Sequence, residues 1–379
     1  MKIVSITPDI DSGGAAKSLF VLSRALAEKG HALRIMTTAK PSRTNRKVEE
    51  LSAMGVEVHY FDIPYFPIRL IVCPIPFWKN VWRTVARLGE FRRLVGEVNA
   101  FGPDLVHYNS YTTLHTSTLL GAFPSVLHAR EVLVEPAPTL PGLKALMRSR
   151  INEVIAISPE EGEQADRLFS IPVTTIFNSP SNLLRYEPFP EGEPIVYGAF
   201  SHITPIKGQL ELVRACVRAA DALRSANVRV RIYGGAVGIH QGYLDSVIDE
   251  IAVNNLGDVV SFEGFTDQPE EEMRRCHLIV RPDATGQPWG RDVIESLSMG
   301  RPVLATGSSQ TFIKPGKNGM LIPPRDVPRL AEALTRMADR SELERMGRAA
   351  YDFACENLNP GTNIARVIDT LERVARQPR

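Results

Sequence analysis

The chain has 379 residues, 44% of them hydrophobic and 23% charged, which excludes a disordered or collagen-like chain and fits two globular domains of about 150–200 residues each. Its formal net charge of +1 gives no overall field to gather nucleic acid, so we expect no nucleic-acid partner. The scattered cysteines have no CxxC spacing, which indicates neither a zinc site nor a disulfide framework for Cys73, Cys216, Cys276 and Cys355.

The first half of the chain alternates short strands with helical segments. Residues 2–7 form a β-branched run, residues 15–29 carry apolar residues at helical spacing, and a second strand is predicted at 33–38. Further short strands are predicted at 56–61, 104–108, 125–129 and 153–158. Such alternation is typical of a doubly wound parallel sheet.

A stretch rich in proline, serine and acidic residues separates this half from a second one of the same kind. We predict an N-terminal Rossmann-like, acceptor-side domain at 1–180, a linker at 181–194 and a C-terminal Rossmann-like, nucleotide-sugar-binding domain at 195–355. The last segment, 356–379, is predicted to be a helix that packs back towards the N-terminal domain.

The most informative stretch is GQPWGRDVIESLSMGRPVLATG at 286–307, which lies between two predicted strands. A loop here opens a helix at Gly290. The free backbone N–H groups and positive dipole end of such a helix make an anion site. Glu295 lies in the early turns of the helix, where an isolated acid is usually only a partner of the helix dipole.

This stretch resembles the family-4 retaining glycosyltransferases, which have the GT-B fold and the pattern E-P-F-G-x-x-x-x-E-A-x-A-x-G-x-P-V. Gln287 stands at the first acid position of the pattern and Glu295 at the second, and Trp289, Gly290 and Arg291 lie between them. The resemblance implies two Rossmann-like, doubly wound α/β domains facing a central cleft. It also implies that Glu295 binds the nucleotide ribose and that Gln287 contacts the hydroxyls of the donor sugar.

A second stretch, FSHITPIKGQLELVRA at 200–215, is similar to the G-R-L-x-x-x-K-G motif of that family. Lys207 matches the lysine that neutralises the donor diphosphate as the leaving group gains charge. Ser201 and His202 replace the usual glycine and arginine. The other half of the diphosphate clamp is therefore left to His202, Arg281 or Arg291.

Three further places follow the family order. Gly13 and Gly14 match its Gly-Gly loop near the donor phosphates or the acceptor, although two glycines after a strand usually only make a turn. Gly264 and Phe265 match the backbone that faces the nucleotide base. His128 matches a histidine that binds and orients the sugar at the carboxyl edge of the first sheet, and it is not assigned the role of a base.

The segment 66–93 combines aromatic residues with an excess of arginine and lysine. It fits either a domain helix with a solvated basic face or a surface that inserts aromatic side chains into an anionic membrane. No apolar run reaches the ~18–20 residues that span a bilayer, so we expect a cytoplasmic protein. On the second of the two interpretations, it would contact the inner face of the membrane through 66–93.

The expected function is retaining transfer of a hexose-like sugar from a nucleoside-diphosphate sugar to a glycan or lipid-linked acceptor, in cell-surface polysaccharide or glycoconjugate synthesis. The nucleotide sugar is a co-substrate, and no cofactor or metal is expected because the helix dipole and Lys207 supply positive potential. Two alternatives stay open: a GT-B-like nucleotide-sugar epimerase, and a degenerate protein that binds nucleotide sugars without catalysis. Gln287, His202 and the pair Ser308-Ser309, where the family has Gly-Gly, are the departures that favour the degenerate protein.

Overall fold

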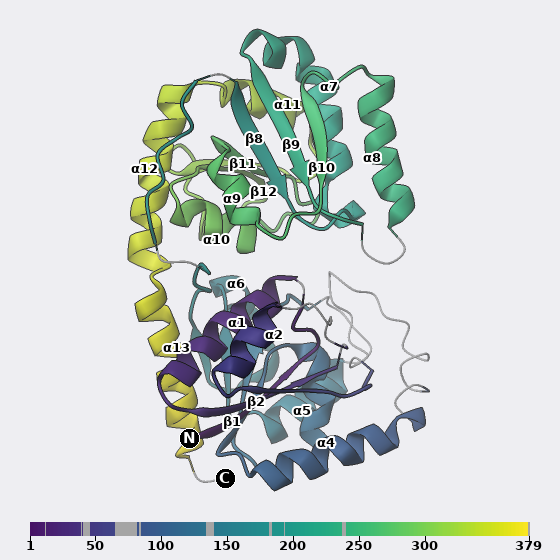
Figure 1. The fold of residues 1–379 in the computed structure, drawn as a ribbon, viewed down its shortest axis with the longest axis vertical. Helices are drawn as coiled ribbons and strands as arrows, with labels where there is room; N and C mark the ends of the chain where they lie inside the picture. The colour runs from purple at the N-terminus through teal and green to yellow at the C-terminus, as the bar shows by residue number, and fades with distance from the viewer. Residues whose placement is uncertain are drawn as a thin grey trace. The chain divides into compact units, whose positions relative to one another are not determined.

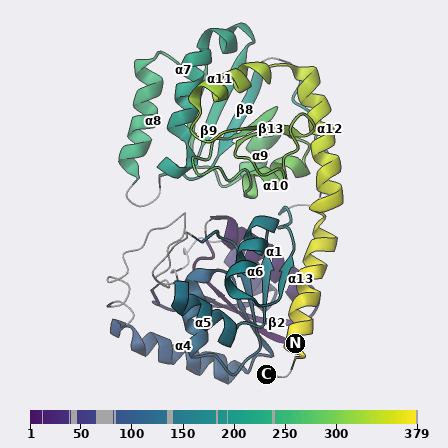
Figure 2. The ribbon, with the colours of Figure 1, turned by 180° about the vertical axis from the view of Figure 1, so that it is seen from behind.

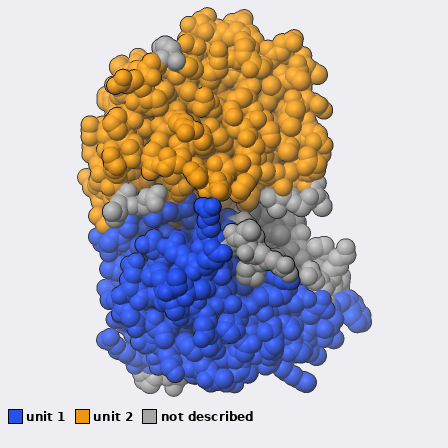
Figure 3. Space-filling view, viewed as in Figure 1, with its two compact units in different colours: residues 1–181, 360–379 blue, residues 182–359 orange. Residues whose placement is uncertain are grey.

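A computed structural model describes the residues 1–11, 13–38, 40, 46–64, 82, 85–133, 140–181, 184–192, 194–236 and 240–377. The chain divides into two compact units, which Figure 3 colours separately. Unit 1 consists of residues 1–181 and 360–379, and unit 2 of residues 182–359. Each unit contains a parallel β-sheet with helices on both faces (Figure 1).

The sheet of unit 1 has the strand order β3-β2-β1-β4-β5-β6-β7. Its strands are β1 (Lys2–Thr7), β2 (Ala32–Thr37), β3 (Glu57–Tyr60), β4 (Leu105–Tyr108), β5 (Ser125–Ala129), β6 (Glu153–Ala156) and β7 (Val173–Thr175). The order reverses between β1 and β4, and in a doubly wound sheet this switch point opens a crevice at the carboxyl ends of the two strands.

Helices cover both faces of this sheet (Figures 1 and 2). One face packs against α1 (Gly13–Glu28), α2 (Arg46–Ala53) and α13 (Pro360–Ala375). The other packs against α4 (Leu88–Phe101), the 3₁₀ helix η1 (Tyr111–Thr118), α5 (Leu140–Arg150) and α6 (Pro159–Phe169). Along β1, Ile3 and Val4 enter opposite cores, as expected for a strand that is buried on both sides.

The sheet of unit 2 has the order β10-β9-β8-β11-β12-β13. Its strands are β8 (Ile195–Phe200), β9 (Val228–Tyr233), β10 (Val260–Gly264), β11 (Leu278–Arg281), β12 (Val303–Thr306) and β13 (Gly319–Ile322). The switch point here lies between β8 and β11. The loops that follow these two strands are therefore expected to meet at one edge of the sheet.

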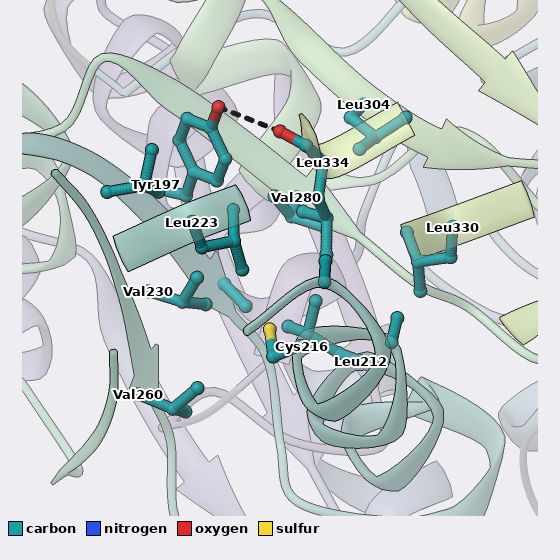
Figure 4. Close-up of a cluster of buried hydrophobic side chains, with 14 of the residues drawn as sticks. Tyr197, Leu212, Cys216, Leu223, Val230, Val260, Val280, Leu304, Leu330 and Leu334 are labelled. Atoms are coloured by element: carbon teal, nitrogen blue, oxygen red, sulfur yellow. Dashed lines mark hydrogen bonds between the residues drawn. The ribbon is translucent and has the colours of Figure 1, made fainter. Parts of the chain in front are cut away.

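The larger core of unit 2 lies between its sheet and α7 (Gln209–Ser225), α8 (Gln241–Val253), α11 (Val327–Arg336) and α12 (Arg340–Asn357). Tyr197 lies in this core, where its hydroxyl donates a 3.0 Å hydrogen bond to the carbonyl oxygen of Leu334 (Figure 4). The opposite face carries a smaller cluster with Met273 of α9 (Pro269–Arg274) and Met299, which follows α10 (Arg291–Ser298).

The two doubly wound parallel sheets predicted from the sequence are confirmed. The predicted strand at 153–158 ends earlier, at Ala156, because Ser158 caps α6 by accepting hydrogen bonds from the N–H groups of Glu160 and Glu161. The expectation that Gly13 and Gly14 lie in a loop is wrong, since both belong to the first turn of α1. Gly13 has φ 83°, a left-handed conformation that favours glycine.

No helix among the described residues is long and apolar enough to cross a membrane. The described cysteines are free thiols: Cys216 and Cys276 are buried and Cys355 is exposed. Cys73 lies outside the described residues.

Candidate functional site

Lys207 lies at the switch point of unit 2, in a short 3₁₀ helix (Pro205–Lys207) between β8 and α7. Gly208 follows it with φ 70°, and a Cβ atom there would lie 1.9 Å from the carbonyl oxygen of Pro282, the residue after β11. The N–H of Ala284 donates a 2.9 Å hydrogen bond to the carbonyl of Ile206. These contacts lock the loop after β8 against the loop after β11 and fix the place of Lys207.

The ammonium group of Lys207 donates a 2.8 Å hydrogen bond to Asp283 Oδ2. Burial, and next the charge of Arg281, lowers the pKa of Lys207. Burial would raise the pKa of Asp283, but Arg281 and Lys207 outweigh it and hold this pKa below its usual value. The three side chains therefore form an ionic group at the edge of the sheet, in which Asp283 and Arg281 are buried and Lys207 is half-buried.

Arg281 holds the loop between β11 and α10 in place. Its Nη1 donates to Asp292 Oδ1 at 2.6 Å, its Nη2 to Asp283 Oδ2 at 3.3 Å and its Nε to the carbonyl of Gln287 at 2.9 Å. The side chain is only 9% exposed. Because two carboxylates already neutralise this guanidinium, it attracts a diphosphate less strongly than its proposed place in the clamp requires. The role that the structure shows for Arg281 is to hold the loop.

Glu295 is buried in α10 and accepts a hydrogen bond from Arg291 Nη2, one helical turn earlier. The two residues are four apart, a spacing at which oppositely charged side chains meet on a helix. The family resemblance predicts separate contacts with the donor for Arg291 and Glu295. The structure instead gives them one ion pair beside the N-terminus of α10.

The other predicted donor residues of unit 2 lie along the same edge of the sheet. His202 is exposed after β8, and its carbonyl accepts a 2.9 Å hydrogen bond from Gln209 Nε2. Gly264 ends β10, and Phe265 beyond it is 76% exposed. The half-buried side chains of Gln287 and Trp289 lie in the loop before α10. The strand ends thus bring the predicted residues of this unit together.

The carboxyl edge of the unit 1 sheet holds a second polar group, centred on Arg130. This arginine donates to His128 Nδ1 at 3.2 Å, to Asn109 Oδ1 at 2.7 Å and to Asn178 Oδ1 at 2.7 Å. His128 is buried in β5, and burial, followed by the charges of Arg130 and His107, lowers its pKa well below 6.5. His128 is therefore neutral at physiological pH.

A small cavity of about 30 Å³ adjoins this group and has room for more than one water molecule. Besides apolar residues of α1 and α13, its lining includes His128, Arg130, Asn178, Ser18 and Asn363. Gly13 and Gly14, at the start of α1, are exposed. A Cβ atom added to Gly13 would meet nothing within 4 Å, so the space beside it is open.

Residues 194–340 match the family described as "Glycosyl transferases group 1", and residues 13–177 match the "Glycosyl transferase 4-like domain". The chain belongs to the group 1 glycosyltransferases. Each of the two matches falls on one of the two parallel-sheet units.

This group 1 glycosyltransferase is 24% identical to a D-inositol 3-phosphate glycosyltransferase of Kribbella flavida over 374 residues, which are 91% of this chain and 87% of that protein. It is 32% identical over 129 residues to an exopolysaccharide phosphotransferase of Streptomyces coelicolor. This match covers 33% of this chain but only 13% of that protein. Its fold is similar to that of Anabaena HepE, solved in complex with UDP and glucose, with a TM-score of 0.78, 21% identity and coverage of 98% and 99% of the two chains.

Two residues of this glycosyltransferase that were not predicted from the sequence hold Lys207 and Arg130: they are Asp283 and Asn109. Both follow a predicted strand directly, and that position was the available signal. Glu131 lies three residues beyond His128. Its carboxylate accepts a 2.6 Å hydrogen bond from Ser110 Oγ, and burial raises the pKa of Glu131 to about 7.

Most of the basic aromatic segment 66–93 of the glycosyltransferase, including Phe77 and Trp78, lies outside the described residues. The exposed apolar side chains of Trp82, Val85 and Leu88 are described. Within the described ranges, no group of three or more His, Cys, Asp or Glu side chains could hold a metal ion. Metal independence stays a prediction.

Gly290 gives a first prediction about this site. A Cβ atom there would lie 2.6 Å from both Arg281 Nη1 and Asp292 Oδ1, so Gly290→Ala should displace this ion pair and the start of α10. We expect donor affinity to fall about tenfold, which corresponds to ~1.4 kcal/mol, with the fold retained. Titration calorimetry with UDP measures the loss. Gly257→Ala, at a glycine with open space around it, is the control, and equal affinities for both variants would contradict the prediction.

Proposed function

We propose that this chain is a retaining glycosyltransferase that moves a hexose from a nucleoside-diphosphate sugar to a glycan or lipid-linked acceptor, in cell-surface polysaccharide or glycoconjugate synthesis. The observation that carries the proposal is the half-buried Lys207, which its bond to Asp283 fixes at the switch point of unit 2, near the N-terminus of α10. Such a site offers positive potential to a diphosphate. The complex of HepE with UDP and glucose supports a uridine nucleotide as the first donor to test.

In the proposed reaction, the bond between the anomeric carbon and the diphosphate oxygen breaks while the acceptor oxygen attacks from the same face. The acceptor proton passes to the departing phosphate, so no side chain has to act as a nucleophile or as a base. Lys207 and the N–H groups at the start of α10 stabilise the charge that grows on the diphosphate. We expect activity to persist in excess EDTA, because these groups supply the positive charge that a divalent ion supplies in metal-dependent enzymes.

A thermal-shift and turnover experiment with UDP and UDP-glucose tests the proposal. A ligand at 100 times its Kd should stabilise the protein by about 2.7 kcal/mol, and release of UDP with a transferred glucose should follow when an acceptor is added. Binding without turnover would favour a non-catalytic protein. An epimerised sugar nucleotide as product would favour an epimerase. No stabilisation by any nucleotide or nucleotide sugar would overturn all three functions.

Glu295→Gln tests the proposed contact with the ribose. A hydrogen bond to a charged acceptor contributes about 1.5–3 kcal/mol, so we expect the Kd of the donor to rise at least tenfold. The unfolding temperature should also fall, because the buried ion pair with Arg291 is lost. Calorimetric titration with UDP gives the Kd. Glu332→Gln, at an exposed acid of α11, controls for the loss of one charge. A donor Kd equal to that of wild type would remove Glu295 from the binding site.

The proposal includes contact with the inner face of a membrane through residues 66–93, because Trp82, Val85 and Leu88 expose apolar side chains next to basic ones. We expect wild-type protein to sediment with anionic vesicles at low salt and to release at high salt. A variant with Trp82→Ala and Arg92→Ala should sediment less. Equal sedimentation with neutral and anionic vesicles would contradict an electrostatic contact.

A further inference from the structure

Arg130 ties together the ends of three strands in unit 1. Its three hydrogen bonds reach His128 in β5, Asn109 just after β4, and Asn178 beyond the end of β7. Asn109 is itself held, because its side-chain amide donates to Thr7 Oγ1 and to the carbonyl of Ala15, both at 3.2 Å. The guanidinium is thus fixed from several sides.

The bond from Arg130 decides which nitrogen of His128 carries the proton. A guanidinium has only donors and stays protonated, so His128 Nδ1 must accept with its lone pair. In a neutral imidazole the proton is then on Nε2. The hydrogen bond described for His128 uses Nδ1, and the ring lines the 30 Å³ cavity.

The charged and titratable groups around His128 agree with a neutral ring. His107 faces it from β4 with a centroid distance of 5.6 Å, and burial, with a smaller effect of Arg130, lowers the pKa of His107 to about 3. Glu131 is the acid next to Arg130, and its carboxylate accepts from Ser110. One cation, two neutral imidazoles and the carboxyl group of Glu131, whose pKa is about 7, therefore share this edge of the sheet.

We propose that Arg130 is a positioning residue that holds His128 as a neutral ring with its proton on Nε2, so that the ring donates to an oxygen of a bound sugar. The identity of the ligand rests on the proposed function, whereas the state of the ring does not. An Nε2 that already carries a proton cannot accept one from an acceptor hydroxyl. His128 then orients the sugar, and deprotonation of the acceptor is left to the leaving group.

Nitrogen NMR of protein labelled in its eight histidines tests the state of the ring, and His128→Gln assigns the resonances. We expect a protonated Nε2 and a bare Nδ1 that do not titrate between pH 5 and pH 8. In Arg130→Met the neighbouring charge and the bond are lost, so the pKa of His128 should rise towards its ordinary value and the two tautomers should mix. Arg148→Met is the matched control, because Arg148 bonds only a backbone carbonyl, that of Phe169 at 3.0 Å, among the described contacts of its side chain.

A proton on Nδ1 in the wild type, or unchanged resonances in Arg130→Met, would overturn the proposal.

Release of UDP from UDP-glucose gives a second readout. Arg130→Met should lower kcat/KM about tenfold while the Kd for UDP, which lacks the sugar, stays within twofold. Arg130→Lys keeps the charge with a single nitrogen and should recover part of the loss. An equal loss of UDP affinity would indicate a merely structural role, whereas a wild type inactive on every nucleotide sugar would fail the proposed function and leave the NMR result standing.

Discussion

Lys207→Ala should lower kcat about 100- to 1000-fold and change the donor KM much less. The reason is that the negative charge met by Lys207 grows as the bond between the sugar and the diphosphate breaks. Only interactions that are stronger in the transition state accelerate the step. In the structure, the bond of 2.8 Å to Asp283 Oδ2 fixes the ammonium group of Lys207, and the close packing of Gly208 against Pro282 fixes the turn that carries it. Steady-state kinetics with the best donor found by thermal shift measures both constants.

Lys314→Ala provides the control, because Lys314 is an exposed lysine of the same unit. A Lys207 variant whose kcat stays within about threefold while KM rises would place this lysine in ground-state binding only. If neither constant changes, the diphosphate is held elsewhere, and the matching of residues 200–208 to the family motif is wrong.

The pH dependence offers an independent check on Lys207. Burial and Arg281 lower its pKa below 10.5, and the charged form is the one that stabilises the leaving group. Activity should therefore decline on the alkaline side as pH rises through this lowered pKa. The decline should be absent from the residual activity of Lys207→Ala, because the titrating group has been removed.

Local features of the site could be predicted from the sequence. The family pattern placed Lys207 before a helix and Glu295 inside one, and both lie there. The four-residue spacing of Arg291 and Glu295 could also have indicated their ion pair. A helix turn is a local structure, so neighbours in the sequence are sufficient to describe it.

The partners of these residues could not be predicted in the same way. Asp283 is 76 residues from Lys207, and the two meet only because β8 and β11 are adjacent in the sheet. Likewise Arg130 meets Asn178 across 48 residues. The order of parallel strands is set by the crossover connections and by the packing of whole helices. No short stretch of a single sequence contains that information.

Arg301 lies inside the family motif but has a structural role. Its replacement should lower the free energy of unfolding more than the other substitutions proposed for this protein. The side chain is fully buried and has no carboxylate partner among its described contacts. Its guanidinium donates to the carbonyl oxygens of Glu187, Pro188, Met299 and Arg274 at 2.7–3.3 Å, and it lies 4.7 Å from the ring centre of Phe189. Burial lowers the pKa of Arg301 to about 10, so the group stays charged at neutral pH.

Arg301→Met should destabilise unit 2 by about 3–5 kcal/mol, because a chain of similar length fills the space but leaves buried carbonyls without donors. For a unit of this size the shift in unfolding temperature is about 10 °C. Arg301→Lys restores charge but only one nitrogen, and we expect an intermediate loss.

Arg336→Met, at an exposed position of α11, should unfold within about 1 °C of wild type. Calorimetry measures the shifts, and amide exchange at Glu187 reports whether the segment entering unit 2 has come loose. If Arg301→Met matches the control in both, these carbonyls do not depend on Arg301, and the arginine is held in the motif by something other than stability.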